Sequence, residues 1–447
     1  MQIDHWMLFS TFAEQRHFEY PRTGTYKGVV INANMAAHAP AGLAAFLLGK
    51  TAGMEYIVDP LTHAFQHDPE VICDDTGKPR SSIKGLAEHY GEPIDALVGS
   101  RPVLPRHFIK DNVLRSFTER CVEFQLNHLR RFMAADDAAK YLEEDEVDVP
   151  PYAVVAPYFF LTETTYGNWL PICRGAAQYA LEKVRRHNRE VRVFGAVVVS
   201  QGILLDNAAQ DEIAREFNAV ELDGYLLWID NLDEQTASRG ELAGLLALVR
   251  RLRMDGRREV VNLHGGYFSI LAAGVLAQNA LSGVTHAPEF GEFRPVIPVG
   301  GGIPIARYYI PTLHARVRYR DALRVFQAKG WLEDAATFYS NICDCDACKD
   351  VLSGDIANFR LFGQSNVRSV RRAHNIVRID FPTTEAKLRC LRHYLQRKHI
   401  EYVRAATASK DELQSDLREG KTSLEEVVGL EGVAHLDRWR LVLGSAD

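Results

Sequence analysis

The sequence predicts an α/β fold, and within that class a closed (β/α)8 TIM barrel. Short apolar runs rich in Val, Ile and Leu alternate with longer helical patterns over roughly 300 residues. The runs are nearly continuous, which is typical of parallel strands buried on both faces. No GxGxxG or GxxxxGK[ST] loop follows the first run, which argues against an open nucleotide-binding sheet and favours a barrel.

Seven segments are expected to be strands: Gly28–Asn32, Glu55–Val58, Tyr152–Val155, Val191–Val199, Gly224–Ile229, Glu259–Leu263 and Gly283–His286. Five segments between them have helical patterns: Ala41–Leu48, Trp169–His187, Ala208–Phe217, Arg239–Arg253 and Phe268–Gln278. Apolar positions at helical spacing separate the second group from the first.

Two segments interrupt the alternation. His67–Val149 is polar and largely helical and predicts a helical insertion over residues 67–150; its acidic end, Glu143–Pro151, is expected to be a solvated linker. After His286 the chain is rich in Gly and Pro, and long loops of this kind are usually functional. We expect a barrel over residues 1–340, a second subdomain over 341–404 and a helical tail over 405–447.

Composition limits the function classes. The 447 residues carry a net charge of −6, so any contact with nucleic acid must come from a local basic patch. The N-terminal residues lack the basic and apolar regions of a secretory signal, and the longest apolar stretch is too short to span a bilayer. We therefore expect a soluble, cytoplasmic protein without a membrane partner.

Three of the seven cysteines lie in the motif Cys343-x-Cys345-x2-Cys348, and His374 follows after 25 further residues. Three thiolates and an imidazole complete a tetrahedral Zn²⁺ shell and leave no position for water, which indicates a structural site. Chance clustering and reactive thiols are the alternatives. Against reactive thiols, the neighbouring carboxylates of Asp344 and Asp346 would raise the thiol pKa values.

The spacing C-x-C-x2-C-x25-H, followed by Asn375, resembles the zinc motif of the tRNA-guanine transglycosylase superfamily. The resemblance is specific in this segment and weaker over the barrel. It implies a (β/α)8 barrel with a zinc-binding subdomain near its end. It also implies an enzyme that exchanges a nucleobase in a polynucleotide.

Catalytic residues of such barrels lie at the carboxyl ends of the strands. The polar residues at the expected strand ends are Asp59, Gln201, Asp230 with Asn231, His264 and His286. Each of them could instead be a satisfied cap or turn residue. By resemblance, Asp59 corresponds to the general acid/base at the end of the family's second strand, although Pro-Leu-Thr-His replaces Ser-Gly-Gly after it.

The resemblance also implies a base pocket. Gln201-Gly202 matches the family's base-binding Gln-Gly, and a glutamine amide offers a donor and an acceptor to a purine edge. A family diglycine is replaced by Ile229-Asp230, so the pocket must differ from the family's. The expected base-binding residues are Gln201, Gly202, Asn231, His264 and Gly265.

The family's nucleophile is an aspartate at the end of its seventh strand, but the matching stretch, Gly283–Glu292, has none. Glu289, Glu292 or Asp230 are the candidates for the attacking carboxylate, with His286 as acid/base or phosphate ligand. Loss of the exchange activity is the alternative.

A basic segment surrounds His374. Residues 368–404 contain ten Lys and Arg against three acidic residues, a composition that favours phosphate contacts. An ordinary solvated helix face is the competing interpretation. The residues expected to contact nucleic acid are Arg368, Arg371, Arg372, Arg397 and Lys398.

Because the family motifs are altered at four places, the chain resembles most the divergent branch of the family that inserts 7-deazaguanine bases into DNA. This resemblance implies an enzyme that exchanges guanine for a 7-deazaguanine base, with DNA favoured over tRNA as the substrate. The alternatives are a non-catalytic, zinc-stabilised nucleic-acid-binding subunit and a nucleoside hydrolase. A homodimer and a complex with a partner subunit both remain open.

Overall fold

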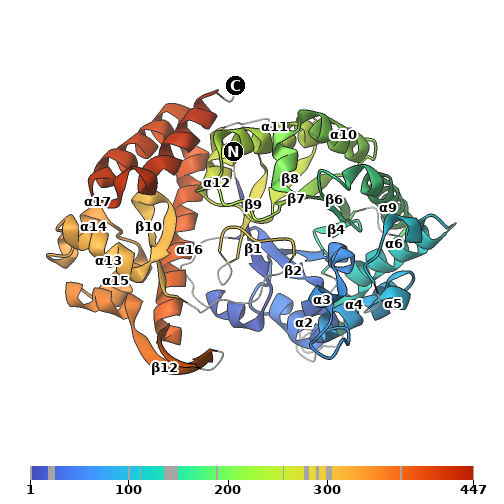
Figure 1. Cartoon of the computed structure of the whole chain (residues 1–447), viewed down its shortest axis with the longest axis horizontal. Coiled ribbons are helices and arrows are strands. Elements are labelled where there is room, and N and C mark those ends of the chain that lie inside the picture. Colours follow the sequence, from blue (N-terminus) through green and yellow to red (C-terminus); the bar gives the residue numbers. More distant parts are fainter. Residues whose placement is uncertain are drawn as a thin grey trace. The chain divides into compact units, whose positions relative to one another are not determined.

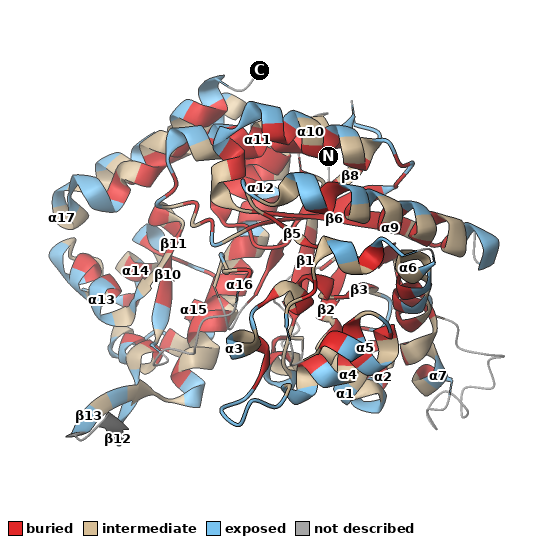
Figure 2. Ribbon diagram, turned by 45° about the vertical axis from the view of Figure 1, so that its right-hand side comes forward, coloured by how far each residue is buried: buried red, intermediate tan, exposed pale blue. Residues whose placement is uncertain are grey.

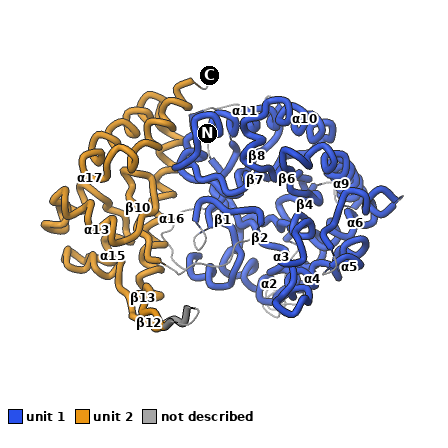
Figure 3. The backbone as a smooth tube through the Cα atoms, viewed as in Figure 1, with its two compact units in different colours: residues 1–19, 26–298, 446 blue, residues 20–25, 299–445, 447 orange. Residues whose placement is uncertain are grey.

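The computed structural model describes residues 3–18, 26–98, 101–110, 112–134, 149–187, 190–254, 256–275, 281–287, 291–297, 305–372 and 375–445 (Figure 1). The chain divides into two compact units (Figure 3). The barrel unit comprises residues 1–19 and 26–298, and the C-terminal unit comprises residues 20–25 and 299–445. Each unit is described by itself.

The barrel unit contains a closed barrel of eight parallel strands, which confirms the predicted fold class. The strands, in their order around the barrel, are β1 (Asp4–Phe9), β2 (Gly28–Asn32), β3 (Glu55–Asp59), β4 (Ala153–Val155), β6 (Arg192–Val199), β7 (Gly224–Ile229), β8 (Glu259–Asn262) and β9 (Gly283–His286). Closure is made by the parallel pairing of β9 with β1. The short strand β5 (Phe160–Leu161) pairs with the end of β6.

All seven predicted strands are present, and each differs from its expected bounds by at most one residue at either end. Of the eight strands that close the barrel, only β1 was not predicted. Its sequence, DHWMLF, includes Asp and His and so lacks the uniform apolar run of the other seven. With β1 included, β3 is the third barrel strand and β9 is the eighth. The family correspondences that placed Asp59 on a second strand and Gly283–Glu292 on a seventh are therefore displaced by one strand.

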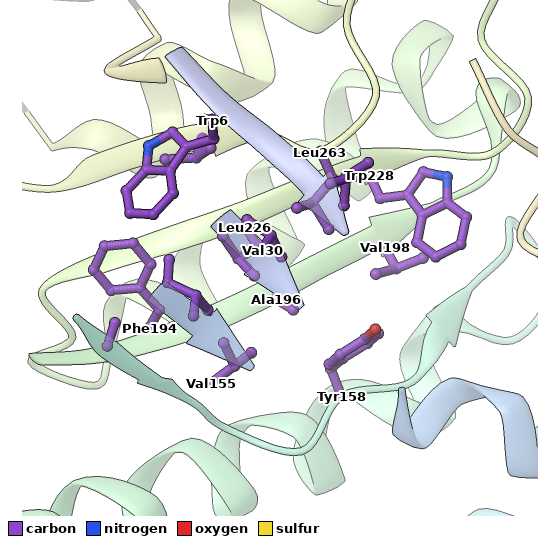
Figure 4. Packing of buried hydrophobic residues seen from close by; sticks show 14 of the residues in the cluster. Trp6, Val30, Val155, Tyr158, Phe194, Ala196, Val198, Leu226, Trp228 and Leu263 are labelled. Carbon is purple, nitrogen blue, oxygen red and sulfur yellow. The ribbon is translucent and has the colours of Figure 1, made fainter. Parts of the chain in front are cut away.

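Side chains from alternate strand positions fill the inside of the barrel. Figure 4 shows this packing around two tryptophans, Trp6 of β1 and Trp228 of β7. The other labelled residues of the cluster are Val30, Val155, Tyr158, Phe194, Ala196, Val198, Leu226 and Leu263. The barrel interior is therefore a packed core, and a site can form only at its ends.

The predicted helices are also present. They are α2 (Pro40–Leu48), α9 (Tyr166–His187), α10 (Asn207–Asn218), α11 (Arg239–Arg253) and α12 (Tyr267–Val275). Each buries one face and exposes the other (Figure 2), except α12, whose residues 267–273 are all buried.

The connection between β3 and β4 contains α3 (Pro69–Ile72), α4 (Ser81–Tyr90), α5 (Ile94–Leu97), α6 (Val113–Glu123) and α7 (Leu129–Met133). Most of the predicted acidic linker, residues 143–148, lies outside the described residues. In the described parts of the chain, no helix has both the length and the apolar character that a membrane span requires.

The C-terminal unit begins before the boundary expected at residue 340. Its first elements are a hairpin of β10 (Arg307–Ile310) and β11 (Ala315–Arg318), followed by α13 (Tyr319–Ala328). These pack on the long helices α16 (Thr384–Thr407) and α17 (Lys410–Ser445). Between them lie α14 (Ala335–Asn341), α15 (Asp346–Leu352) and a two-stranded ribbon of β12 (Ser365–Arg372) and β13 (Asn375–Pro382).

Candidate active site and metal centre

A cavity of about 260 Å³ lies at the carboxyl ends of the barrel strands. Its wall includes residues that end or follow β1, β2, β3, β7 and β8, where barrel enzymes place their catalytic groups. The polar and aromatic residues that line it are Ser10, Asn32, Asn34, Asp59, His63, His67, Arg80, Ser82, Trp228, His264 and Arg294. This cavity is the candidate active site of the barrel unit.

Asp59 is the last residue of β3 and is buried. Its Oδ1 accepts hydrogen bonds from the Tyr158 hydroxyl (2.6 Å) and the Leu61 backbone N–H (3.1 Å). Burial raises the pKa of Asp59 to about 6 despite these bonds and the nearby charge of Arg294, which lower it. A carboxyl group that titrates close to neutral pH suits the transfer of protons in both directions.

Asp59, Tyr158 and His63 form a hydrogen-bonded chain. Because the single hydroxyl proton of Tyr158 is donated to Asp59, the Nδ1 atom of His63, 3.1 Å from the same hydroxyl, must be the donor in that contact. Burial holds the pKa of His63 well below its usual range, so the ring is neutral. Thr62 fixes the chain by exchanging hydrogen bonds of 2.6 and 2.8 Å with the backbone of Tyr158.

Arg294 was not among the predicted site residues. Its backbone carbonyl accepts hydrogen bonds from the Trp228 indole (3.0 Å) and the Asn231 backbone N–H (2.9 Å). The Asp230 carboxylate accepts a further bond, 2.7 Å long, from the backbone of Val296. These three bonds hold the loop after β9 against the end of β7 and place Arg294 in the cavity wall.

The predicted base-binding residues divide into two groups. His264 lines the cavity, and burial lowers its pKa to about 3, so its ring is neutral. The amide nitrogen of Gln201 instead donates to the backbone carbonyls of Asp230 (3.1 Å) and Asn231 (2.8 Å). Gln201 and Asn231 thus organise the end of β7 and do not line the cavity.

The two predicted glycines serve packing. A Cβ atom on Gly202 would overlap the Glu163 carboxylate, and one on Gly265 would overlap Val284 and Ser269. Neither glycine lines the cavity, so close packing of the loops explains both without a bound base.

His286 does not face the cavity. Its neighbour Ala287 belongs to the cluster inside the barrel, and successive strand residues point to opposite faces. His286 is fully buried, with its ring 5.2 Å from that of His5 in an edge-on arrangement. The side chain of His286 therefore lies on the outer face of the barrel wall, away from the cavity. This position does not support the acid/base role expected for His286.

Of the candidate nucleophiles, Glu289 lies outside the described residues, Asp230 binds the backbone of Val296, and Glu292 lies next to Glu234. A Cβ atom on Gly266 would be 2.7 Å from one Glu234 oxygen and 3.2 Å from one Glu292 oxygen. Burial and, to a smaller extent, the charge of Glu292 raise the pKa of Glu234 to about 7. Neither glutamate lines the cavity described above.

The C-terminal unit contains the predicted cysteine cluster with a different histidine. Cys343, Cys345, Cys348 and His393 are buried, and their ligand atoms all lie within 4.8 Å of one another. His374, the expected fourth ligand, lies outside the described residues, between β12 and β13 in the sequence. The fourth position is therefore assigned to His393, which lies on helix α16.

The donor atoms of the cluster lie close enough together to hold a metal ion. The Nδ1 atom of His393 lies 3.4 Å from the Cys345 sulfur and 3.3 Å from the Cys348 sulfur. Zn–S bonds near 2.3 Å and Zn–N bonds near 2.1 Å would separate such atoms by about 3.6 Å. The Nε2–H of His393 donates a hydrogen bond of 2.8 Å to the Tyr309 carbonyl oxygen. This bond leaves the Nδ1 atom of the same ring to bind the metal. The donors present therefore fit a four-coordinate metal ion.

The predicted basic segment is divided between two environments. Arg368 and Arg378 of the ribbon are exposed, whereas the side chains of Arg371 and Arg372 lie outside the described set. Arg397 is half-buried, and Lys398 is fully buried, with its ammonium group 3.1 Å from the Glu401 carboxylate. Lys398 belongs to the core of the C-terminal unit and is not available to nucleic acid.

Comparison of the chain with protein-family models and with curated proteins finds no match.

Proposed function

We propose that this protein is a base-exchanging glycosyltransferase that replaces guanine with a 7-deazaguanine base in a polynucleotide. The observation that carries the proposal is Asp59, a carboxyl group with a pKa of about 6 in a cavity walled by Trp228, His63 and His264. Flat aromatic walls suit a stacked heterocycle, and the carboxyl group suits the protonation of a leaving base.

The reaction needs two groups. A carboxylate forms a bond to the anomeric carbon while the bond from that carbon to the base nitrogen breaks, and the departing base takes a proton from an acid. Asp59 is assigned the proton transfer, and its carboxylate then accepts the proton of the incoming base. Glu289, which follows β9 in the sequence, is assigned the attack on carbon, because Glu292 lies next to Glu234 and does not line the cavity.

The metal ion is proposed to be Zn²⁺ in a structural role, because three thiolates and one imidazole leave no open position for a substrate. The partner is proposed to be duplex DNA. The ribbon β12–β13 presents Arg368 and Arg378 to solvent, and a two-stranded ribbon has the width that the major groove of DNA admits.

The decisive experiment measures release of radiolabelled guanine from duplex DNA and from tRNA, with and without added 7-deazaguanine. Wild type should release guanine in amounts that depend on the added base, and Asp59→Asn should lower the rate by about 10²-fold or more. The matched control, Asp75→Asn, removes an exposed carboxylate outside the cavity and should leave the rate unchanged. Release that needs no incoming base would indicate a hydrolase, and no release from either polymer would indicate a non-catalytic binding subunit.

A further inference from the structure

Two hydrogen-bond acceptors in the cavity wall have no partner within the described parts of the chain. They are Nε2 of His67 and Oδ1 of Asn34, both shielded from solvent. His67 is only 5% exposed. A buried polar atom without a hydrogen bond costs roughly 1 to 3 kcal/mol, so atoms of this kind in a cavity wall indicate a ligand that completes them.

The protonation of His67 follows from its other ring nitrogen. A hydrogen bond with the backbone of Val296 raises the pKa of His67, which only a bond donated by the ring to a carbonyl can do, and burial lowers the pKa by more. Because Nε2 has no partner, the donor is Nδ1. The ring is therefore neutral, with its proton on Nδ1 and an acceptor lone pair on Nε2 that no described residue uses.

Asp59 adds a third acceptor. Both hydrogen bonds that the described residues make to its carboxylate end on Oδ1. Oδ2 is therefore left for a ligand in the same cavity. Three acceptors would repel an anion, so this wall suits a neutral molecule that offers hydrogen-bond donors.

We propose that the cavity selects a planar heterocycle by its N–H donor edge, a ring N–H beside an exocyclic amino group, and that His67 and Asn34 determine this selectivity. Guanine and 7-deazaguanine have this edge. The inference rests on the proposed function for the idea that the ligand is a base. The choice of edge rests on the acceptors of His67, Asn34 and Asp59.

The test is calorimetric titration of the full-length protein with free bases and without any polynucleotide. The probes are 7-deazaguanine, 7-deazahypoxanthine, which lacks the amino group, and 2-amino-7-deazapurine, which lacks the ring N–H and the carbonyl. Removing either donor should weaken binding by about tenfold or more. Equal affinity for all three bases would overturn the proposal.

Variants locate the effect. His67→Phe keeps a ring but removes the acceptor, and Asn34→Leu removes the second acceptor; each should lower the preference for 7-deazaguanine by about tenfold. His67→Gln, which retains an acceptor oxygen, should restore part of it and guards against loss of folding in His67→Phe. His187→Phe, on the exposed end of α9, is the matched control. An unchanged preference in both cavity variants would refute the assignment of these residues.

The two proposals fail separately. Selective binding of 7-deazaguanine without guanine release from DNA or tRNA would contradict the proposed reaction and keep the inference. Guanine exchange whose base preference is unchanged in the His67 and Asn34 variants would support the proposed reaction and contradict the inference.

Discussion

At the scale of single residues, the buried carboxyl group of Asp59 lowers the stability of the fold, and it is the group proposed to transfer protons. Its pKa is raised from 3.8 to about 6 by burial, so the folded chain binds a proton between these pH values that the unfolded chain releases. Stability must then fall as pH rises from about 4 to 6 and stay low above that range. Ionisable groups whose pKa is strongly shifted by burial are concentrated in active sites.

Asp59→Asn should therefore stabilise the protein at pH 7.5, because the amide keeps the acceptor for Tyr158 without a buried charge. The pKa shift sets an upper limit of about 3 kcal/mol on the gain, which should vanish below pH 4. Urea denaturation at pH 4 to 8 measures it, with Asp75→Asn as control. A gain of equal size at every pH would contradict a titrating Asp59.

Substitution of His374 and of His393, which are 19 positions apart in the sequence, tests which histidine is the fourth metal ligand. His393→Ala should yield protein with little bound metal and reduced solubility, because the chain then has three donors around the ion. His374→Ala should retain about one Zn²⁺ per chain, as wild type should. Metal analysis by mass spectrometry decides between them. Loss of metal from the His374 variant alone would restore the ligand set expected from sequence spacing.

Local signals in the sequence identified some of the residues that the structure brings into the cavity and the cysteine cluster, but not all of them. Asp59 and the three cysteines were found because strand ends and short-range spacing are local properties. His393 was missed since the ribbon β12–β13 lies between the cysteines and α16, which makes spacing a poor guide. His63 and His67 follow β3 at a separation of four, a signal available in the sequence. Arg294 has no local signal, because hydrogen bonds to β7 position it.

At the scale of elements, the predicted basic patch proves to be two structures. The second part of the basic segment forms α16, where Lys398 is buried beside Glu401 and its ammonium group lies 3.2 Å from the Tyr309 hydroxyl. The ribbon was not predicted, because its strands mix Arg, Ser and Val without a face to bury. Its apolar residues Val367 and Ile376 are 65% and 75% exposed. Such a ribbon is suited to contact a partner on either face.

Arg368→Glu with Arg378→Glu should weaken binding to duplex DNA and reduce the slope of log K against log salt by about 2, since each lost phosphate contact removes about 0.9. The matched control, Arg320→Glu with Arg324→Glu on α13, makes the same change in net charge at exposed positions. Fluorescence anisotropy at several salt concentrations measures both. Equal effects of the two double variants would show that only net charge matters.

At the scale of the whole molecule, the chain forms two compact units, and the metal cluster found among the described residues belongs to the C-terminal unit. Removing the metal with a chelator should therefore unfold the C-terminal unit and leave the barrel folded. Limited proteolysis followed by mass spectrometry should then show early cleavage within residues 305–445 and protection of α9 to α11. Simultaneous cleavage of both units would contradict their independence.

The pairing of β1 with β9, which closes the barrel, also affects how the chain folds during its synthesis. β1 is synthesised first, yet its partner β9 begins 279 residues later, at Gly283 against Asp4. At about 5 to 20 residues per second, a ribosome needs roughly 14 to 56 s to cover that distance. Throughout this interval, the edge of β1 that pairs with β9 in the folded barrel has no partner. The corresponding edge of β8 is also unpaired from the time β8 is synthesised until β9 follows. A growing chain of this protein is thus a natural client for chaperones, and stop codons placed before β9 should give aggregating products.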